Sequence, residues 1–272
     1  RSCTAQAPGA PTKPMHCSQR TAAPGTTQVI SKKSARMIEE FFFAQRAELF
    51  EALTKHCANV LRRGVETHDH ATVFVSGGST PLPLYRQLSR QELSWKKVDI
   101  ALVDERWVNP GQPGSNETAI VDNLLQNRAS EAAFFGMKTA AGTATEGEVQ
   151  CETRYRRIHC PFDLCILGLG ADGHTASLFP HAGNLAYALD ENNARLCTHI
   201  QARESAVTGK FTERMTLTLN AIRACNTIIL LITGEEKLEV YRTALHSQDT
   251  LGLPVSALLH SAGSKVSVYW AP

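Results

Sequence analysis

A histidine in a glycine-rich turn is the residue of this sequence best placed to do chemistry. Residues 168–180 read GLGADGHTASLFP and follow a strongly apolar run. The glycines let the backbone bend sharply, so the imidazole of His174 can point out over the end of the preceding strand. An imidazole whose unperturbed pKa is ~6.5 suits general-base catalysis at neutral pH, and the carboxylate of Asp172 can orient it. An isolated histidine is more often structural, but this position favours a catalytic His174 supported by Asp172, with Gly173 beside the substrate.

A second glycine-rich turn, residues 76–80, lies between an apolar run and a helical pattern. Two adjacent glycines allow a ligand to approach the backbone and direct N–H groups at an anion. We expect Ser79 or Thr80 to cap the following helix, with Pro81 at its first position. The turn lacks the Gly-Lys-Ser/Thr of a Walker A loop, and a plain capped turn explains the same residues. The predicted phosphate-binding residues are Ser76, Gly77, Gly78, Ser79 and Thr80.

Charged residues end two further apolar runs. The sequence Asp-Glu-Arg-Trp, residues 104–107, follows one of them, and the forked guanidinium of Arg106 suits a phosphate or a developing oxyanion. We expect Arg106 to take part in catalysis and Asn116, in the loop that follows, to contact the substrate. Arg214, predicted just before a helix, and Lys237, at a helix start, are weaker candidates for phosphate contacts. A surface role explains Arg214 and Lys237 equally well.

Two patterns suggest other ligands but do not fit them. The glycines at 168, 170 and 173 match the dinucleotide-binding fingerprint G-x-G-x-x-G, and Asp190 lies at the distance of a ribose contact. That fingerprint requires a full helix after the last glycine, whereas Pro180 arrives too soon. Residues 68–70, His-Asp-His, resemble a metal trio, but they precede a predicted strand at the opposite, amino-terminal edge. We interpret them as a solvated loop and expect neither a metal nor a cofactor.

Apolar runs alternate with helical patterns along the chain, which predicts an α/β fold: a Rossmann-like, open, mostly parallel sheet with helices on both faces. In such sheets ligands bind at the carboxyl ends of the strands, where the polar motifs fall. The expected strands cover residues 71–75, 98–103, 162–169, 227–232 and 265–270. The expected helices cover residues 31–63, ended by Gly64, and residues 81–90, 117–126, 146–158, 216–224 and 235–246. We predict one domain over residues 28–272, preceded by a disordered extension or leader, residues 1–27.

Composition excludes several classes of protein. The net charge of +2 offers no electrostatic basis for binding nucleic acid or an anionic membrane, and no apolar run is long enough to cross a bilayer. The eight cysteines form no C-x-x-C pair, so we expect reduced thiols and a cytoplasmic protein. We expect a monomer or a weak homo-oligomer.

Taken together, these motifs resemble the 6-phosphogluconolactonase family, within the group that also contains glucosamine-6-phosphate deaminases. The matching segments are SGGSTP (76–81), DERWV (104–108), SN (115–116), LGLGADGHTASLFP (167–180), RMTLTL (214–219) and TGEEK (233–237). The resemblance runs from about residue 29 to the C-terminus. It implies that a phosphorylated sugar lactone is hydrolysed without a cofactor, with His174 as the general base and Arg106 binding substrate. Deaminases of this group carry an Asn-Glu-Pro segment after the histidine, and Leu178, Phe179 and Pro180 stand there instead.

The resulting hypothesis is hydrolysis of 6-phospho-D-glucono-1,5-lactone, the second step of the oxidative pentose phosphate pathway. The phosphate is expected on residues 76–80, which fixes the lactone carbonyl near a water activated by His174. Two alternatives remain: an amino-sugar phosphate deaminase or isomerase, and a non-catalytic sugar-phosphate sensor. A sensor would keep the phosphate turn without needing His174, and would usually add a DNA-binding or partner module, of which the sequence has no sign.

Overall fold

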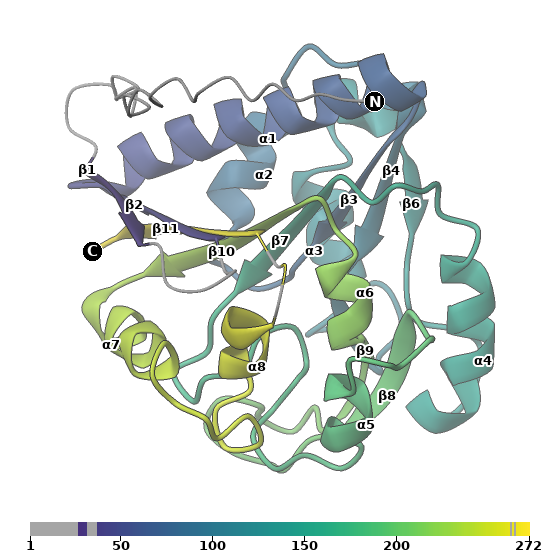
Figure 1. Cartoon of the computed structure of the whole chain (residues 1–272). Helices are drawn as coiled ribbons and strands as arrows, with labels where there is room; N and C mark the ends of the chain where they lie inside the picture. Colours follow the sequence, from purple (N-terminus) through teal and green to yellow (C-terminus); the bar gives the residue numbers. More distant parts are fainter. Residues whose placement is uncertain (1–26, 32–36, 262, 264) are drawn as a thin grey trace, which may run out of the picture.

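The main element of the fold is a mostly parallel sheet. The computed structural model describes residues 27–31, 37–261, 263 and 265–272, and within them eight strands follow the order β1-β2-β11-β10-β7-β3-β4-β6 (Figure 1). Every neighbouring pair is parallel except β1 with β2. The strands are β1 (Thr27–Ser31), β2 (Met37–Phe42), β3 (Ala71–Val75), β4 (Val98–Leu102), β6 (Ala133–Phe135), β7 (Leu164–Gly168), β10 (Thr227–Thr233) and β11 (Lys265–Ala271).

Helices cover both faces of this sheet, which confirms the predicted Rossmann-like α/β class. Helices α1 (Arg46–His68) and α2 (Leu82–Leu88) lie on one side, and α6 (Leu219–Arg223), α7 (Glu235–Ala244) and α8 (Val255–His260) lie on the other (Figure 1). The remaining helices are α3 (Asn116–Asn123), α4 (Ala144–Tyr155) and α5 (Leu185–Leu189), with short 3-10 turns at Trp95–Lys97 and Asn127–Glu131. No helix in the described part of the chain is both long and apolar enough to span a bilayer.

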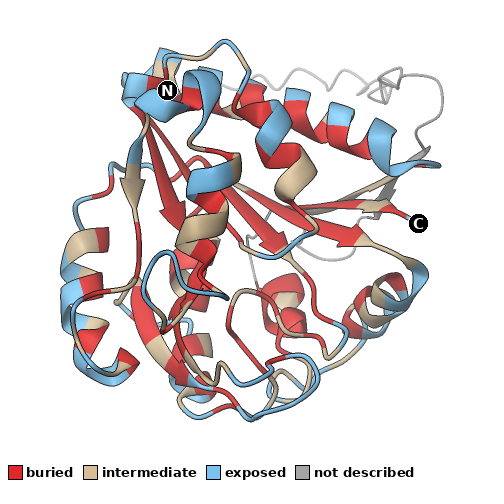
Figure 2. Ribbon diagram, turned by 180° about the vertical axis from the view of Figure 1, so that it is seen from behind, coloured by how far each residue is buried: buried red, intermediate tan, exposed pale blue. Residues whose placement is uncertain are grey.

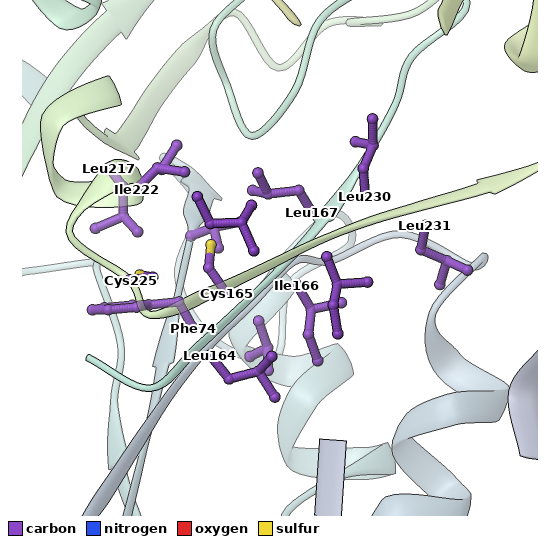
Figure 3. Packing of buried hydrophobic residues seen from close by; sticks show 14 of the residues in the cluster. Phe74, Leu164, Cys165, Ile166, Leu167, Leu217, Ile222, Cys225, Leu230 and Leu231 are labelled. Carbon is purple, nitrogen blue, oxygen red and sulfur yellow. The ribbon is translucent and has the colours of Figure 1, made fainter. Parts of the chain in front are cut away.

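The core lies between these layers. All five residues of β3 and of β4 are buried, as a strand covered on both faces requires (Figure 2). Phe74, Ile166 and Leu230 of the central strands belong to one hydrophobic cluster with Leu217 and with Ile222 of α6 (Figure 3). Six of the cysteines lie in the described residues as free thiols, and five of these are buried.

A second, smaller sheet was not predicted. Strands β5 (Asp104–Arg106), β9 (Glu213–Leu217) and β8 (Cys197–Gln201) form an antiparallel sheet in the order β5-β9-β8. The predicted helix over residues 216–224 is therefore wrong at its start, because residues 213–217 pair with strands on both sides. Thr218 then accepts a hydrogen bond from the Ala221 N–H at 3.1 Å and caps α6. The helical spacing of the apolar residues concealed this change from strand to helix.

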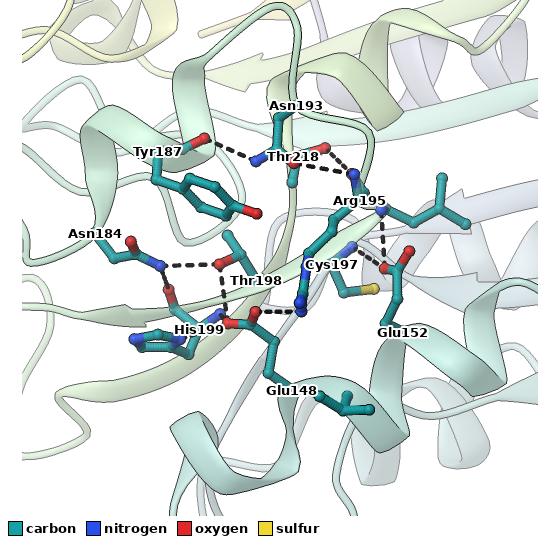
Figure 4. Close-up of polar contacts among 12 residues, drawn as sticks. Glu148, Glu152, Asn184, Tyr187, Asn193, Arg195, Cys197, Thr198, His199 and Thr218 are labelled. Atoms are coloured by element: carbon teal, nitrogen blue, oxygen red, sulfur yellow. Dashed lines mark hydrogen bonds and ion pairs between the residues drawn. The ribbon is translucent and has the colours of Figure 1, made fainter.

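Two glutamates of α4 fasten the small sheet to the rest of the fold (Figure 4). Glu148 pairs with Arg195 at 2.7 Å and accepts a hydrogen bond from the His199 N–H at 3.0 Å. Glu152 accepts the Cys197 N–H at 2.9 Å. Burial raises the pKa of Glu148, but the hydrogen bonds and the charge of His199 outweigh it and lower the pKa overall. These contacts favour an ionised Glu148 that holds β8 against α4.

The predicted first helix, residues 31–63, is wrong at both ends. Residues 37–42 form β2 and pair in parallel with β11, and α1 begins only at Arg46. The helical spacing of Met37, Phe41 and Phe42 could not reveal this partner, because β11 lies at the far end of the chain. The helix also continues past Gly64 to His68, where Asp69 adopts a left-handed conformation with φ of 60°. The expectation for residues 1–27 falls outside the described residues except at Thr27, which begins β1.

Gly64 is a close-packing position inside α1. A Cβ added there would lie 2.8 Å from the Asp163 Oδ1 and 2.9 Å from the Ala71 Cβ. Ala71 is the buried first residue of β3. Helix α1 and strand β3 therefore lie so close together that a side chain at position 64 would clash with its neighbours.

We expect Gly64→Ala to destabilise the protein. Alanine gains about 1 kcal/mol in helix propensity, but the clash with Ala71 and Asp163 costs more. The expected net loss of unfolding free energy is about 1–2 kcal/mol, measured by urea unfolding. The exposed Thr67→Ala on the same helix should stay within about 0.5 kcal/mol of the wild type. A Gly64→Ala protein as stable as the wild type would mean that the two elements can separate at little cost.

Glu105 holds the start of α3. Its side chain is fully buried, and its Oε1 accepts the N–H groups of Asn116 at 2.7 Å and Arg106 at 2.9 Å. Its Oε2 accepts the Glu117 N–H at 2.8 Å, so the carboxylate bonds two unpaired donors of the first turn of α3. Burial raises the pKa of Glu105 to about 7, although these hydrogen bonds act in the opposite direction.

The raised pKa makes a prediction for the pH dependence of stability. Between the ordinary value of 4.5 and about 7, folded Glu105 keeps a proton that the unfolded chain has released. The wild type should therefore lose stability relative to Glu105→Gln as the pH rises through this range, with little further change above it. Urea unfolding of both proteins at about pH 5, 6, 7 and 8 measures the difference, with the exposed Asp122→Asn on α3 as a control. A constant difference would show that the surrounding donors keep the carboxylate ionised throughout.

Candidate active site

A cleft of about 390 Å³ opens where β3, β7 and β10 end. It lies at the carboxyl edge of the sheet, where parallel α/β folds bind ligands. Ten of the twelve predicted site residues line it: Ser76, Gly77, Gly78, Ser79, Thr80, Arg106, Asn116, His174, Arg214 and Lys237. The remaining two, Asp172 and Gly173, are not in the lining. The structure thus brings together residues that are far apart in the sequence, since Lys237 follows Ser76 by 161 positions.

The His174 side chain is held by its own turn, residues 168–180. The Asp172 Oδ1 lies 2.5 Å from the His174 Nδ1 and also accepts the His174 N–H at 3.2 Å. Burial raises the pKa of Asp172, but the bonds to His174 outweigh it and lower the pKa, which favours an ionised carboxylate. A Cβ on Gly170 would lie 2.0 Å from the His174 Nδ1, so only glycine permits this arrangement. Gly173, with φ of +81°, instead packs against Leu253, so it shapes the turn without lining the cleft.

The turn at residues 76–80 is shaped by close contact with Asn116. A Cβ on Gly77 would lie 1.9 Å from the Asn116 Oδ1, and Gly78 has φ of +84° with open space around it. The Tyr85 hydroxyl donates to the Ser76 carbonyl at 2.8 Å and fixes the start of the turn. The expected cap is wrong: α2 begins at Leu82, after Pro81, without a side-chain cap. The Leu82 N–H instead donates to the Ser79 carbonyl at 3.4 Å.

The carboxylate of Asp104 links the two turns. Its Oδ2 accepts the Ser177 hydroxyl at 2.5 Å, and Ser177 belongs to the turn that carries His174. Its Oδ1 accepts the Asn116 side-chain amide at 3.2 Å, and Asn116 packs on Gly77. Asp104 is buried and lines the cleft. The sequence marked Asp104 only as one charge of a motif, and its bridging position depends on contacts between distant segments.

Two arginines give the cleft its positive charge. Arg106 and Arg214 are directly opposite each other in the β5–β9 pairing. The Arg106 Nη1 donates to the Gly114 carbonyl at 2.6 Å, while its buried Nε has no hydrogen-bond partner among the described residues. Burial lowers the pKa of Arg214 to about 10, and the neighbouring Arg106 charge acts in the same direction. A buried Arg214 beside a half-buried Arg106 with an unpaired N–H favours an anionic ligand.

Arg214 does not precede a helix, as was predicted, but lies within β9 and is almost fully buried. Its guanidinium Nε donates to the Phe211 carbonyl at 2.6 Å, and its Cζ lies 5.0 Å from the centre of the Phe179 ring. The Phe179 ring is also 4.3 Å from the imidazole of His174, centre to centre. In the sequence, Phe179 stands out only as part of the motif at residues 167–180. Its contacts with both His174 and Arg214 make it a positioning residue of the cleft.

The part of the chain described by the structure contains one group of three side chains with the spacing of metal ligands, namely His70, Asp99 and His159. It is not in the cleft: His70 directly precedes β3 and Asp99 is the second residue of β4, so the group lies at the amino edge of the sheet. His68 and Asp69 are exposed, as expected, but His70 is half-buried and faces Asp99. The interpretation of residues 68–70 as a solvated loop is therefore wrong for His70, which is half-buried, and for His68, which is the last residue of α1.

The structure of the histidine turn, residues 168–180, does not match a dinucleotide-binding motif. After Gly173 the chain runs through bends and turns until α5 begins at Leu185. The long helix that would carry a pyrophosphate at its N-terminus is therefore absent at this position. The glycines of this turn serve the close approach of the His174 ring instead.

Comparison with known proteins places the chain in a family. Residues 44–270 match the family described as glucosamine-6-phosphate isomerases/6-phosphogluconolactonase. A 6-phosphogluconolactonase of Rhizobium meliloti is 37% identical over 230 residues, which cover 85% of this chain and 97% of the relative. A 6-phosphogluconolactonase of Pseudomonas aeruginosa is 31% identical over 226 residues, covering 83% of this chain and 92% of the relative.

Solved structures agree with this assignment. The crystal structure of a 6-phosphogluconolactonase from Shewanella baltica superimposes with a TM-score of 0.82 at 36% identity, covering 90% of this chain and all of that one. The similarity includes the segments that carry the cleft, because it extends over nearly the whole described chain. The chain belongs to the glucosamine-6-phosphate isomerase/6-phosphogluconolactonase family.

Proposed function

We propose that this protein hydrolyses 6-phospho-D-glucono-1,5-lactone to 6-phosphogluconate, in the oxidative pentose phosphate pathway. The observation that carries the proposal is that His174, residues 76–80 and two arginines line one cleft at the carboxyl edge of the sheet. The relatives named above are 6-phosphogluconolactonases, which favours this activity over deamination within the same family. No step of the proposed reaction requires a metal or a cofactor.

Substrate binding comes first in this mechanism. The phosphate binds to the backbone N–H groups of the turn at residues 76–80, and the positive charges of Arg106, Arg214 and Lys237 attract it to the cleft. Asn116, which also lines the cleft, packs against Gly77 and supports this turn. Fixing the phosphate restricts the lactone ring to a small region over the histidine turn, which converts binding energy into correct orientation of the carbonyl.

His174 then acts as the general base. Its Nδ1 faces the ionised Asp172, so Nδ1–H donates to the carboxylate and the lone pair of Nε2 is directed away from it. Nε2 takes a proton from a water molecule, the resulting hydroxide adds to the lactone carbonyl, and a tetrahedral oxyanion forms. The protonated imidazole returns the proton to the ring oxygen as the carbon–oxygen bond breaks. Arg106, through its unpaired Nε, or backbone N–H groups of a glycine turn stabilise the oxyanion.

Replacing His174 tests the base. We expect His174→Ala to lower kcat for 6-phosphogluconolactone by about 10²–10⁴-fold after spontaneous hydrolysis is subtracted. Asp172→Asn should lower it less, because it removes the group that orients the imidazole and not the base itself. His181→Asn is the matched control, since His181 is exposed and follows the same turn in the left-handed conformation that asparagine tolerates. Near-native turnover by His174→Ala would exclude His174 as the base, and release of ammonia from an amino-sugar phosphate would favour the deaminase alternative.

Replacing Arg106 tests the phosphate contact. We expect Arg106→Ala to lower kcat/KM for the phosphorylated lactone by about 10- to 100-fold, the effect of losing a hydrogen bond between charged groups. Unphosphorylated glucono-1,5-lactone should be much less affected, because it makes no such contact. The exposed Arg90→Ala serves as the control for loss of a positive charge. An equal loss for both lactones would assign Arg106 to the oxyanion and not to the phosphate.

A further inference from the structure

Three side chains with metal-binding chemistry converge at the edge of the sheet opposite to the cleft. They are His70, directly before β3, Asp99 in β4, and His159, in the connection from α4 to β7. One ligand atom from each lies within 4.8 Å of the others. The pairing of β3 with β4 places Thr72 opposite Asp99, which brings His70 alongside the carboxylate.

The carboxylate of Asp99 is buried without an ordinary positive partner. Its side chain is only 2% exposed, and its ion-pair contacts are the His70 Nε2 at 3.1 Å and the His159 Nδ1 at 2.8 Å. No lysine or arginine of the described segments pairs with it. A buried carboxylate is strongly destabilised unless positive charge compensates it. A cation shared by the carboxylate and the two imidazole nitrogens would supply that charge.

The two imidazoles lie close together. Their ring centres are only 3.7 Å apart, so nitrogen atoms of both rings can reach one metal ion beside Asp99. The buried Nε2 of His70 also lacks a hydrogen-bond partner among the described residues, because its contact with Asp99 has poor geometry. A buried nitrogen without a hydrogen-bond partner costs free energy of folding. A metal ion bound beside the carboxylate would provide the missing partner.

The backbone around the cluster is fixed, but one of its side chains is free to adjust. The His159 N–H donates to the Asp99 Oδ2 at 3.0 Å, and the Thr72 hydroxyl donates to the His159 carbonyl at 2.8 Å. The His159 side chain is nevertheless 61% exposed, whereas that of His70 is only 21% exposed. The His159 ring can therefore rotate out of the stack and direct a nitrogen lone pair at an ion held by Asp99 and His70.

We propose that His70, Asp99 and His159 bind a divalent transition-metal ion of the Zn²⁺ type. Two neutral imidazole nitrogens and one carboxylate oxygen are a ligand set that Zn²⁺ accepts, with a fourth position on the exposed side for water. The ion would join the amino ends of β3 and β4 to the α4–β7 connection. Because the cleft lies at the opposite ends of these strands, the ion adds stability without entering the reaction.

The experiment measures zinc binding by the full chain after treatment with a chelator. Zn²⁺ is titrated in competition with a chromophoric chelator into the wild type, His159→Gln, His70→Gln and the control His246→Gln, an exposed histidine at the end of α7. We expect the wild type and the control to bind one ion that both cluster variants bind about 100-fold or more weakly. An ion bound near His174 would remain in all four proteins and cancel in this comparison.

Two further measurements separate a metal site from a merely structural cluster. At a free Zn²⁺ concentration 100 times the Kd, the Tm of the wild type should rise by about 5–10 °C and that of His159→Gln should not. Co²⁺ should give the wild type a visible absorption band that His159→Gln lacks. Unchanged lactone hydrolysis by His159→Gln shows that the variant is folded. Equal zinc affinity and an equal Tm shift in the wild type and both cluster variants would overturn the proposal and leave the imidazoles as partners of Asp99 alone.

Discussion

The buried carboxylate of Asp104 is the constraint on which the geometry of the cleft depends. It accepts the Ser177 hydroxyl from the histidine turn and the Asn116 amide from the start of α3. Asn116 in turn fits against the backbone of Gly77, where no side chain could be accommodated. The contacts of Ser177, Asp104 and Asn116 thus connect the turn that carries the proposed base to the proposed phosphate site. They restrict the movement of either turn relative to the other. Removing any member would change the distance between the two turns, on which orientation of a substrate depends.

The charges of the cleft show why bulk composition says little about the ligand. The chain has a net charge of only +2, yet Arg106 and Arg214 are neighbours across the small sheet. Asp104 favours the charged form of Arg214, and burial and Arg106 oppose it. Keeping both guanidinium groups charged side by side therefore costs free energy, and an anion bound to them would offset part of this cost. A preference of the cleft for an anion is compatible with the small net charge, because only a few groups inside the cleft determine which ligand it prefers.

The sequence predicts the structure well where the residues of a single element carry the information. The continuous apolar runs of β3, β4, β7, β10 and β11 predict buried parallel strands, and the glycine turns that follow them mark the working edge of the sheet. Ten predicted residues consequently line one cleft. These successes share a physical basis: the signal lies in consecutive residues and does not require knowledge of a distant partner.

The errors occur where distant partners decide the structure. Residues 37–42 have helical spacing but form β2 because β11, more than two hundred residues later, offers an edge to pair with. Residues 213–217 form β9 because β5 and β8 flank them on both sides. The contacts of Phe179 with His174 and Arg214 likewise involve a residue 35 positions away, since 214 − 179 = 35. Propensity is a weak guide at such positions, and pairing within the folded protein overrides it.

The parallel sheet separates two kinds of polar chemistry by the direction of its strands. At the carboxyl ends, the glycine turns leave N–H groups and an imidazole facing an open cleft. At the amino ends, the cluster of His70, Asp99 and His159 joins β3 and β4 to the connection between α4 and β7. The strands between them are buried and nearly entirely apolar, and their five residues separate the two edges by about 17 Å. A change at the amino edge should therefore alter stability without altering the reaction, whereas a change at the carboxyl edge can alter the reaction in a protein that remains folded.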